Sequence, residues 1–187
     1  IRSIREKELA EHQVENCMMC GRCAEICPVG IDINSLRLIS RNRSSFDDKS
    51  DFNYLTDKVT KTTDILFFAG CMTHLTPSII HSVKEIFNMA KINFRFMDED
   101  GGACCGRPLK LAGRSKDADK LIEYNRNEII NSGAGIMVTS CPICLKTFKE
   151  DYSLGTIRVL HHSQFILELW KEKKIHLSKQ LIAMTYH

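Results

Sequence analysis

The sequence predicts an α/β protein in which a small helical N-terminal domain precedes a larger domain built on a parallel β-sheet. Residues 1–45 carry few strand signals and have a helical pattern, interrupted by a cysteine-dense loop at residues 17–30. From residue 65 onward, short apolar runs typical of buried strands alternate with segments of helical periodicity. A polar stretch separates the two regions. We therefore predict domains at 1–45 and 64–187, joined by a linker at 46–63.

The order of elements in the larger domain favours right-handed crossovers and a parallel sheet. Five segments are predicted strands: residues 65–70, 93–98, 135–140, 156–161 and 181–186. The helices between them are predicted to start at Thr76-Pro77, Ser115, Pro142 and Ser163. Gly133 is expected to end the second of these helices, because glycine readily adopts the left-handed conformation of a helix C-terminus.

Composition narrows the class of protein. The 187 residues include 26 basic and 23 acidic side chains, a balance unlike the strongly basic surface of nucleic-acid-binding proteins. The longest apolar run, 65–72, is too short to cross a bilayer. Nine cysteines, an odd number with metal-site spacing, indicate a reducing cytoplasm rather than a disulfide scaffold. The chain starts without methionine and stops within an apolar stretch, so we expect a fragment, with the second domain cut short at its C-terminal end.

The first cysteine set is Cys17, Cys20, Cys23 and Cys27, which with Pro28 forms a C-x2-C-x2-C-x3-C-P run. Three thiolates two residues apart can wrap one corner of a [4Fe-4S] cubane, and in the bacterial ferredoxin pattern the fourth cysteine ligates a neighbouring cluster. If Cys27 ligates a neighbouring cluster, the cluster held by Cys17, Cys20 and Cys23 needs a fourth ligand. That ligand would come from a second run of cysteines upstream, which we favour, or from a partner chain. Alternatively, Cys27 is itself the fourth ligand of this cluster. Zinc is the alternative metal, but zinc sites usually use two well-separated C-x2-C pairs.

The second cysteine set is dispersed over more than seventy residues of sequence. Its members follow three predicted strands, and they are Cys71, Cys104, Cys105, Cys141 and Cys144. Because parallel strands end at one edge of a sheet, all five are expected to gather there. Adjacent cysteines are poor disulfide partners, since a trans peptide holds their Cα atoms about 3.8 Å apart. Five thiolates exceed the four that a cubane takes, so we predict an unusual cluster or one spare sulfur.

The Cys104-Cys105-Gly106 sequence, with Cys71 before it and the Cys141/Cys144 pair after it, resembles the cysteine-rich CCG domain of heterodisulfide reductases. The related iron–sulfur subunits of glycolate, lactate and glycerol-3-phosphate dehydrogenases share this domain. The N-terminal run resembles the second of the paired ferredoxin motifs of these proteins. The resemblance implies a helical ferredoxin-like domain followed by a CCG domain, with all five cysteines of the second set holding a non-cubane four-iron cluster.

The resemblance further implies an iron–sulfur oxidoreductase subunit that passes electrons between its two clusters. A flavin-containing dehydrogenase or reductase subunit, together with other iron–sulfur subunits, is the expected partner, in the cytoplasm or at a membrane through that partner. Two alternatives remain: a catalytic thiol–disulfide (heterodisulfide) reductase, and a zinc-stabilised docking module. No catalytic residue can be assigned.

Two other groups of side chains have simpler interpretations. His74 and His161 are expected near the cysteine edge, in hydrogen-bonded or solvent-facing positions. The acidic run Asp98-Glu99-Asp100 is interpreted as a solvated turn rather than a metal site.

Overall fold

The computed structural model describes residues 14–44, 52, 62–101 and 103–178. Its larger region contains a four-stranded sheet in the order β2-β1-β3-β4, in which every neighbouring pair is parallel. The strands are β1 (Ile65–Phe68), β2 (Phe94–Phe96), β3 (Ile136–Thr139) and β4 (Arg158–His161). The predicted α/β class and parallel sheet are therefore confirmed. The fifth predicted strand, 181–186, lies outside the described residues, as does nearly all of the linker at 46–63.

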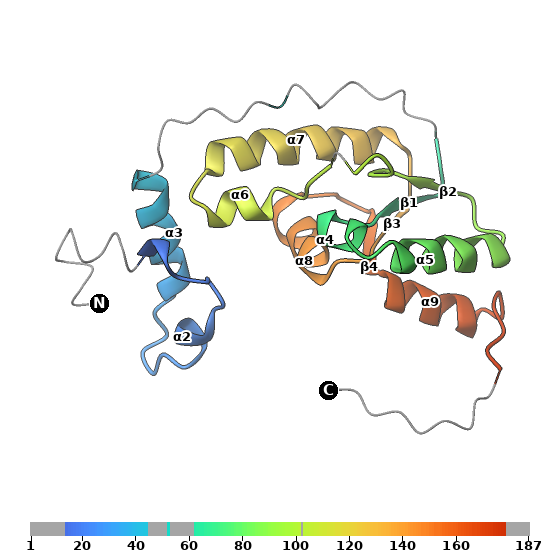
Figure 1. Ribbon diagram of the computed structural model, residues 1–187, viewed down its shortest axis with the longest axis horizontal. Helices are drawn as coiled ribbons and strands as arrows, with labels where there is room; N and C mark the ends of the chain where they lie inside the picture. Colours follow the sequence, from blue (N-terminus) through green and yellow to red (C-terminus); the bar gives the residue numbers. More distant parts are fainter. Residues whose placement is uncertain (1–13, 45–51, 53–61, 102, 179–187) are drawn as a thin grey trace.

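Helices cover both faces of this sheet (Figure 1). The helices that pack on the sheet are α5 (Pro77–Met89), α7 (Ser115–Asn131), α8 (Pro142–Asp151) and α9 (His162–Lys171). Side chains of α7 and α8 share one buried cluster with one face of the sheet, and side chains of α5 and α9 share another with the opposite face. The result is a three-layer α/β/α arrangement, which explains why the strands are continuous apolar runs.

The central strand β1 shows how the sequence pattern produces these layers. All four of its residues are buried, because β2 and β3 flank it and helices cover both faces. Leu66 and Phe68 point into the cluster with α7 and α8, whereas Ile65 and Phe67 point into the cluster with α5 and α9. Alternate side chains of a strand face opposite ways, so an unbroken apolar run can supply both cores.

The smaller N-terminal region is helical. It contains α2 (Arg22–Glu25) and α3 (Ile33–Ser44), with the first cysteine set in and around α2. Figure 1 shows this region beside α6 (Arg107–Leu111) of the larger region.

Most predicted helix starts are confirmed: α7 begins at Ser115, α8 at Pro142, and α5 at Pro77 after Thr76. The prediction that Ser163 caps the last helix is wrong. His161 occupies the N-cap: its Nδ1 accepts from the Ser163 amide at 3.4 Å, and the Gln164 side chain accepts from the His161 amide at 2.9 Å. An imidazole nitrogen thus replaces the usual hydroxyl or carboxylate of a capping box.

The sequence did not reveal the short helices α6 and α4 (Cys71–His74), because five and four residues are too few to show helical periodicity.

Replacing Phe67 by alanine tests the packing of the sheet core. Phe67 is fully buried, and its ring lies 5.7 Å from that of Phe87 and 4.9 Å from that of Phe96, measured between centroids. We expect Phe67→Ala to lower the free energy of unfolding by about 3–5 kcal/mol, because truncation leaves a cavity. The matched control is Met89→Ala, whose side chain is 70% exposed. Thermal unfolding of the anaerobically purified proteins measures both, and equal losses would contradict the assignment of this core.

Two candidate cysteine sites

The first cysteine set lies on a short loop–helix–loop segment. Cys17 and Cys20 precede α2, Cys23 lies within it and Cys27 follows it. Gly21 is the residue before α2, and its φ of 85° is one that side-chain-bearing residues rarely adopt. This glycine lets the chain reverse between Cys20 and Cys23. Cys20 is exposed and the other three cysteines are partly exposed.

Hydrogen-bond donors surround two of these sulfurs. The Met19 amide donates to Cys17 Sγ and the Ile31 amide donates to Cys27 Sγ, each at 3.4 Å. Arg37, from α3, brings a guanidinium nitrogen to 2.6 Å from Cys17 Sγ. Because guanidinium groups are cationic donors, this contact suits a sulfur that carries negative charge.

The second cysteine set occupies the carboxyl edge of the sheet, as expected. Cys71 is the first residue of α4, directly after β1, and Cys141 is the N-cap of α8, directly after β3. These two strands are neighbours, yet the chain leaves β1 toward β2 on one side and leaves β3 toward β4 on the other. Such a reversal opens a crevice between the ends of the two strands, where open α/β sheets bind their ligands.

Four of the five sulfurs of this set, those of Cys104, Cys105, Cys141 and Cys144, are linked by hydrogen bonds. The Cys104 and Cys144 thiols donate to Cys105 and lower its pKa to about 3, while these hydrogen bonds and then burial raise the pKa values of the two donors. Cys144 also donates to Cys141 and lowers its pKa to about 6. The charge of Cys71 acts on Cys104 and raises its pKa further. Cysteines from two separate segments therefore form one hydrogen-bonded group, in which Cys105, Cys141 and Cys144 are buried, and the exposed Cys71 acts on it through charge.

Backbone amides also point at these sulfurs. The amides of Ile143 and Cys144, in the first turn of α8, donate to Cys141, and the amide of Arg107 donates to Cys105. Both interactions lower the pKa of the sulfur concerned. Helix N-termini favour negative charge in this way, because their first amides have no partner within the helix.

A glycine permits the close approach of the segments at this edge. A Cβ atom at Gly70 would lie 3.0 Å from both Cys141 Cβ and Cys144 Sγ, and the φ of Gly70 is 87°. A side chain here would crowd the Cys141 and Cys144 side chains and strain the backbone at this positive φ. Gly70 is therefore a requirement for placing Cys71 beside the Cys141/Cys144 pair.

Two buried polar residues fix the backbone of the adjacent cysteines. Asn125 of α7 donates from Nδ2 to the Cys104 carbonyl at 2.8 Å and to the Tyr152 hydroxyl at 3.1 Å. The Tyr152 hydroxyl donates in turn to the Cys105 carbonyl at 3.1 Å. Burial raises the pKa of Tyr152, so the hydroxyl keeps its proton and remains a donor. Sequence reasoning did not assign this role, although a polar residue on the apolar side of α7 was a usable signal.

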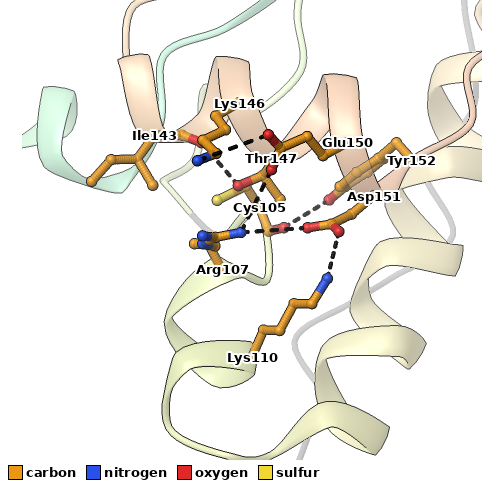
Figure 2. Close-up of polar contacts among 9 residues, drawn as sticks. All are labelled: Cys105, Arg107, Lys110, Ile143, Lys146, Thr147, Glu150, Asp151 and Tyr152. Atoms are coloured by element: carbon orange, nitrogen blue, oxygen red, sulfur yellow. Dashed lines mark hydrogen bonds and ion pairs between the residues drawn. The ribbon is translucent and has the colours of Figure 1, made fainter. Parts of the chain in front are cut away.

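Ion pairs hold the loop of the adjacent cysteines against α8 (Figure 2). Lys110 of α6 donates to Asp151 at the end of α8, and Arg107 lies 3.9 Å from Asp151 and 4.0 Å from Glu150. Figure 2 shows these charges next to Cys105 and Tyr152. Helix α6, which starts directly after Gly106, is thereby fastened to the helix that carries Cys144.

Asp98 contradicts the interpretation of residues 98–100 as a solvated turn. Its side chain is fully buried and accepts from the amides of Ala69 and Gly70, both at 2.8 Å. His74 Nε2 lies 3.2 Å from the same carboxylate. Burial raises the pKa of Asp98, and the hydrogen bonds from the two amides and His74 oppose that shift. Asp98 thus holds the turn that precedes Cys71. The sequence did not indicate this role, because Asp98 stands beside two exposed acidic residues.

The two histidines expected near this edge do lie there. His74 bonds Asp98, and His161 Nε2 lies 3.1 Å from the carbonyl of Ser140, the residue before Cys141. Both rings therefore support the backbone next to a cysteine from hydrogen-bonded structural positions.

The cysteine sulfurs and their hydrogen-bond donors suit an iron–sulfur cluster at each site. Each site offers cysteine sulfurs together with amide or cationic donors aimed at them, and iron–sulfur clusters are bound by thiolates whose hydrogen bonds tune the potential. Within the described ranges, no three His, Cys, Asp or Glu side chains are grouped as a single metal ion would require. The same ranges contain no helix long and apolar enough to cross a membrane.

Both regions match families of known proteins. Residues 65–149 match a cysteine-rich domain family named CCG, and residues 11–31 match a 4Fe-4S binding domain family. No solved structure gives a significant match.

Curated relatives are similar over nearly the whole chain. An uncharacterised iron–sulfur protein of Methanococcus maripaludis is 26% identical over 98% of this chain and 42% of its own length. One subunit of the dihydromethanophenazine:CoB–CoM heterodisulfide reductase of Methanosarcina acetivorans is 27% identical over 98% of this chain and 54% of its own. One subunit of the fumarate reductase (CoM/CoB) of Methanothermobacter marburgensis is 24% identical over 91% and 39%. The chain thus spans about half the length of these relatives or less.

Replacing Asp98 by asparagine tests the support of the Cys71 turn. The substitution exchanges one acceptor oxygen for an NH₂ group that would face the amide of Ala69 or Gly70. We expect a loss of about 1–3 kcal/mol in the free energy of unfolding, because a buried donor is left without a partner. The control is Glu99→Gln, since Glu99 is exposed and forms a surface ion pair with Lys84. Similar unfolding temperatures for the two variants would refute this role of Asp98.

Proposed function

We propose that this chain, a CCG-domain iron–sulfur protein related to a heterodisulfide reductase subunit, passes electrons between two clusters within a multisubunit oxidoreductase. The strongest support is the contact among the sulfurs of Cys104, Cys105, Cys141 and Cys144, which come from distant parts of the sequence. They meet at the edge of a parallel sheet where open α/β sheets bind their ligands.

The proposed ligands follow from the two sets. Cys17, Cys20 and Cys23 would hold a [4Fe-4S] cubane, with Cys27 as its fourth ligand or as a ligand of a neighbouring cluster. All five cysteines of the second set would hold a second iron–sulfur cluster, for which the resemblance favours a non-cubane form. We assign the first site to a domain at 1–45 and the second to a domain at 64–187, with a linker at 46–63.

The clusters would supply one-electron transfer, and the chain controls their surroundings. Arg37 and the Met19 amide donate hydrogen bonds to the Cys17 sulfur at the first site. At the second site, burial of Cys105 and Cys144 excludes water from part of the ligand set. Such hydrogen bonds and burial are the means by which a protein adjusts the potential of a cluster.

A partner subunit completes this proposal. Large apolar side chains remain exposed beside both cysteine sets: Met18 (90%), Met72 (62%), Leu75 (75%) and Ile143 (57%). Exposed apolar side chains at a functional site favour contact with another protein. We propose another subunit of a multisubunit reductase as that partner, because two of the relatives described above are named as subunits of reductases. The resemblance favours a flavin-containing dehydrogenase or reductase subunit, in the cytoplasm or at a membrane through that partner.

A second candidate is a thiol–disulfide reductase acting at the second site. Its support is Cys71, which is exposed whereas Cys105, Cys141 and Cys144 are buried, and which is a fifth sulfur beyond the four ligands of a cubane. Reduction of a disulfide to two thiols would consume two electrons, delivered singly through the first site, and two protons from solvent.

Serine substitutions at Cys105 and Cys20 separate the two proposed sites. We expect each variant to lose one of two iron–sulfur EPR signals and about half of the bound iron and sulfide, because each removes a ligand of one cluster only. Anaerobic purification, metal and sulfide analysis, and EPR measure this, and each variant is the control for the other. Retention of both signals in Cys105→Ser would contradict the second site, and zinc without sulfide there would instead support a docking module. Disulfide reduction by the reduced wild-type protein would favour the second candidate.

A further inference from the structure

One arginine joins the two cysteine regions. The guanidinium of Arg41, in α3, donates to four backbone carbonyls. The carbonyls of Val14, Glu15 and Cys17 accept at 3.0, 2.8 and 2.6 Å, and they belong to the segment that leads into the first cysteine set. The fourth carbonyl is that of Leu111, the last residue of α6. A planar guanidinium with five N–H donors can make such a set of contacts, and a lysine cannot.

A glycine allows the two regions to approach this closely. A Cβ atom at Gly113, in the turn between α6 and α7, would lie 2.6 Å from the carbonyl carbon of Arg41 and 2.7 Å from its oxygen. Those distances are shorter than any van der Waals contact, and the neighbouring atoms are backbone atoms that cannot rotate away. Helix α3 therefore rests directly on the α6–α7 turn, and any side chain at Gly113 would separate them.

The same interface completes a helix cap. The N-cap of α7 is Arg114, whose side chain makes no capping hydrogen bond. Instead the Ser115 amide donates to Asn42 Oδ1 of α3 at 3.3 Å. A side chain of the N-terminal region thus satisfies one of the free amides at the start of α7.

The opposite side of the first cysteine loop also faces the second region. A cavity of about 650 Å³ is lined by residues 20–22, 24, 25 and 34 together with Lys146 of α8. Lys146 follows Cys144 by two residues, and Leu111 follows Cys105 by six. The first cysteine loop therefore borders both α6 and α8, and each of these helices begins just after a cysteine of the second set.

We propose that Arg41 is a positioning residue that sets the distance between the two cysteine sites, by docking α3 and the first cysteine loop onto the α6–α7 turn. This inference rests on the proposed relay function, since a fixed distance matters only if electrons cross it. The guanidinium acts through the backbone that carries Cys17 and through the helix that follows Cys105.

The test uses two matched pairs of variants in the anaerobically purified, cluster-loaded protein. Arg41→Ala is compared with Arg43→Ala, because Arg43 lies on the same helix with an exposed side chain. Gly113→Ala is compared with Gly133→Ala. Both glycines have positive φ, 83° and 68°, but a Cβ at Gly133 meets nothing within 4 Å. Gly113→Ala and Gly133→Ala therefore strain the backbone alike, but only Gly113→Ala adds a clash with Arg41.

Amide hydrogen exchange gives the first readout. We expect Arg41→Ala and Gly113→Ala to raise exchange roughly tenfold or more at residues 15–19 and 109–117, with the sheet unchanged, because hydrogen bonds from a charged group are lost or strained. Arg41→Lys should give an intermediate increase, since lysine keeps the charge without the fork of donors. Unchanged exchange in Arg41→Ala would overturn the docking, whatever clusters the protein holds.

The magnetic interaction between the two clusters gives the second readout, measured by EPR at unchanged iron content. It should weaken in Arg41→Ala and Gly113→Ala and stay at the wild-type value in both controls. Faster exchange with an unaltered interaction would overturn the claim that Arg41 sets the distance between the sites. Absence of a second iron–sulfur signal in the wild type would refute the proposed function instead, and the exchange result would still decide the docking.

Discussion

The switch point between the parallel strands β1 and β3, after which the chain continues to opposite sides of the sheet, is the constraint on which the rest of the structure depends. Because neighbouring parallel strands end together, the loops after them must share one crevice, and this chain places cysteines in those loops. The crevice is narrow enough that only glycine fits at position 70. The sheet therefore determines which sulfurs meet, and the close approach at Gly70 determines how tightly they meet.

Buried polar side chains make this edge rigid. Asp98 holds the turn before Cys71, and Asn125 with Tyr152 holds the carbonyls of Cys104 and Cys105. Each of these cysteine loops is thus tied to a neighbouring element through its backbone, so a ligand sulfur can keep its position when the charge of the site changes. Such preorganisation is what hydrogen bonds to the ligand-bearing segments provide at metal centres generally.

Periodicity and motif spacing were sufficient for the sheet, the long helices and the convergence of the second cysteine set. They failed where the determining contact is distant in sequence. Asp98 resembles its exposed neighbours, and only the amides of Ala69 and Gly70, almost thirty residues away, account for its burial. Gly113 and Arg41 resemble an ordinary turn residue and an ordinary surface cation until α3 is placed on the α6–α7 turn. His161 replaced Ser163 as a cap because an imidazole nitrogen can accept where a hydroxyl was expected.

The most direct test of this account is the location of iron in crystals grown anaerobically from the cluster-loaded protein. Anomalous scattering at the iron edge should give peaks at the carboxyl ends of β1 and β3, within bonding distance of the sulfurs of Cys105, Cys141 and Cys144, and a separate group of peaks beside Cys17, Cys20 and Cys23. A zinc signal at the sheet edge, or iron confined to the N-terminal loop, would contradict the central claim that the distant cysteines of the sheet domain together hold an iron–sulfur centre.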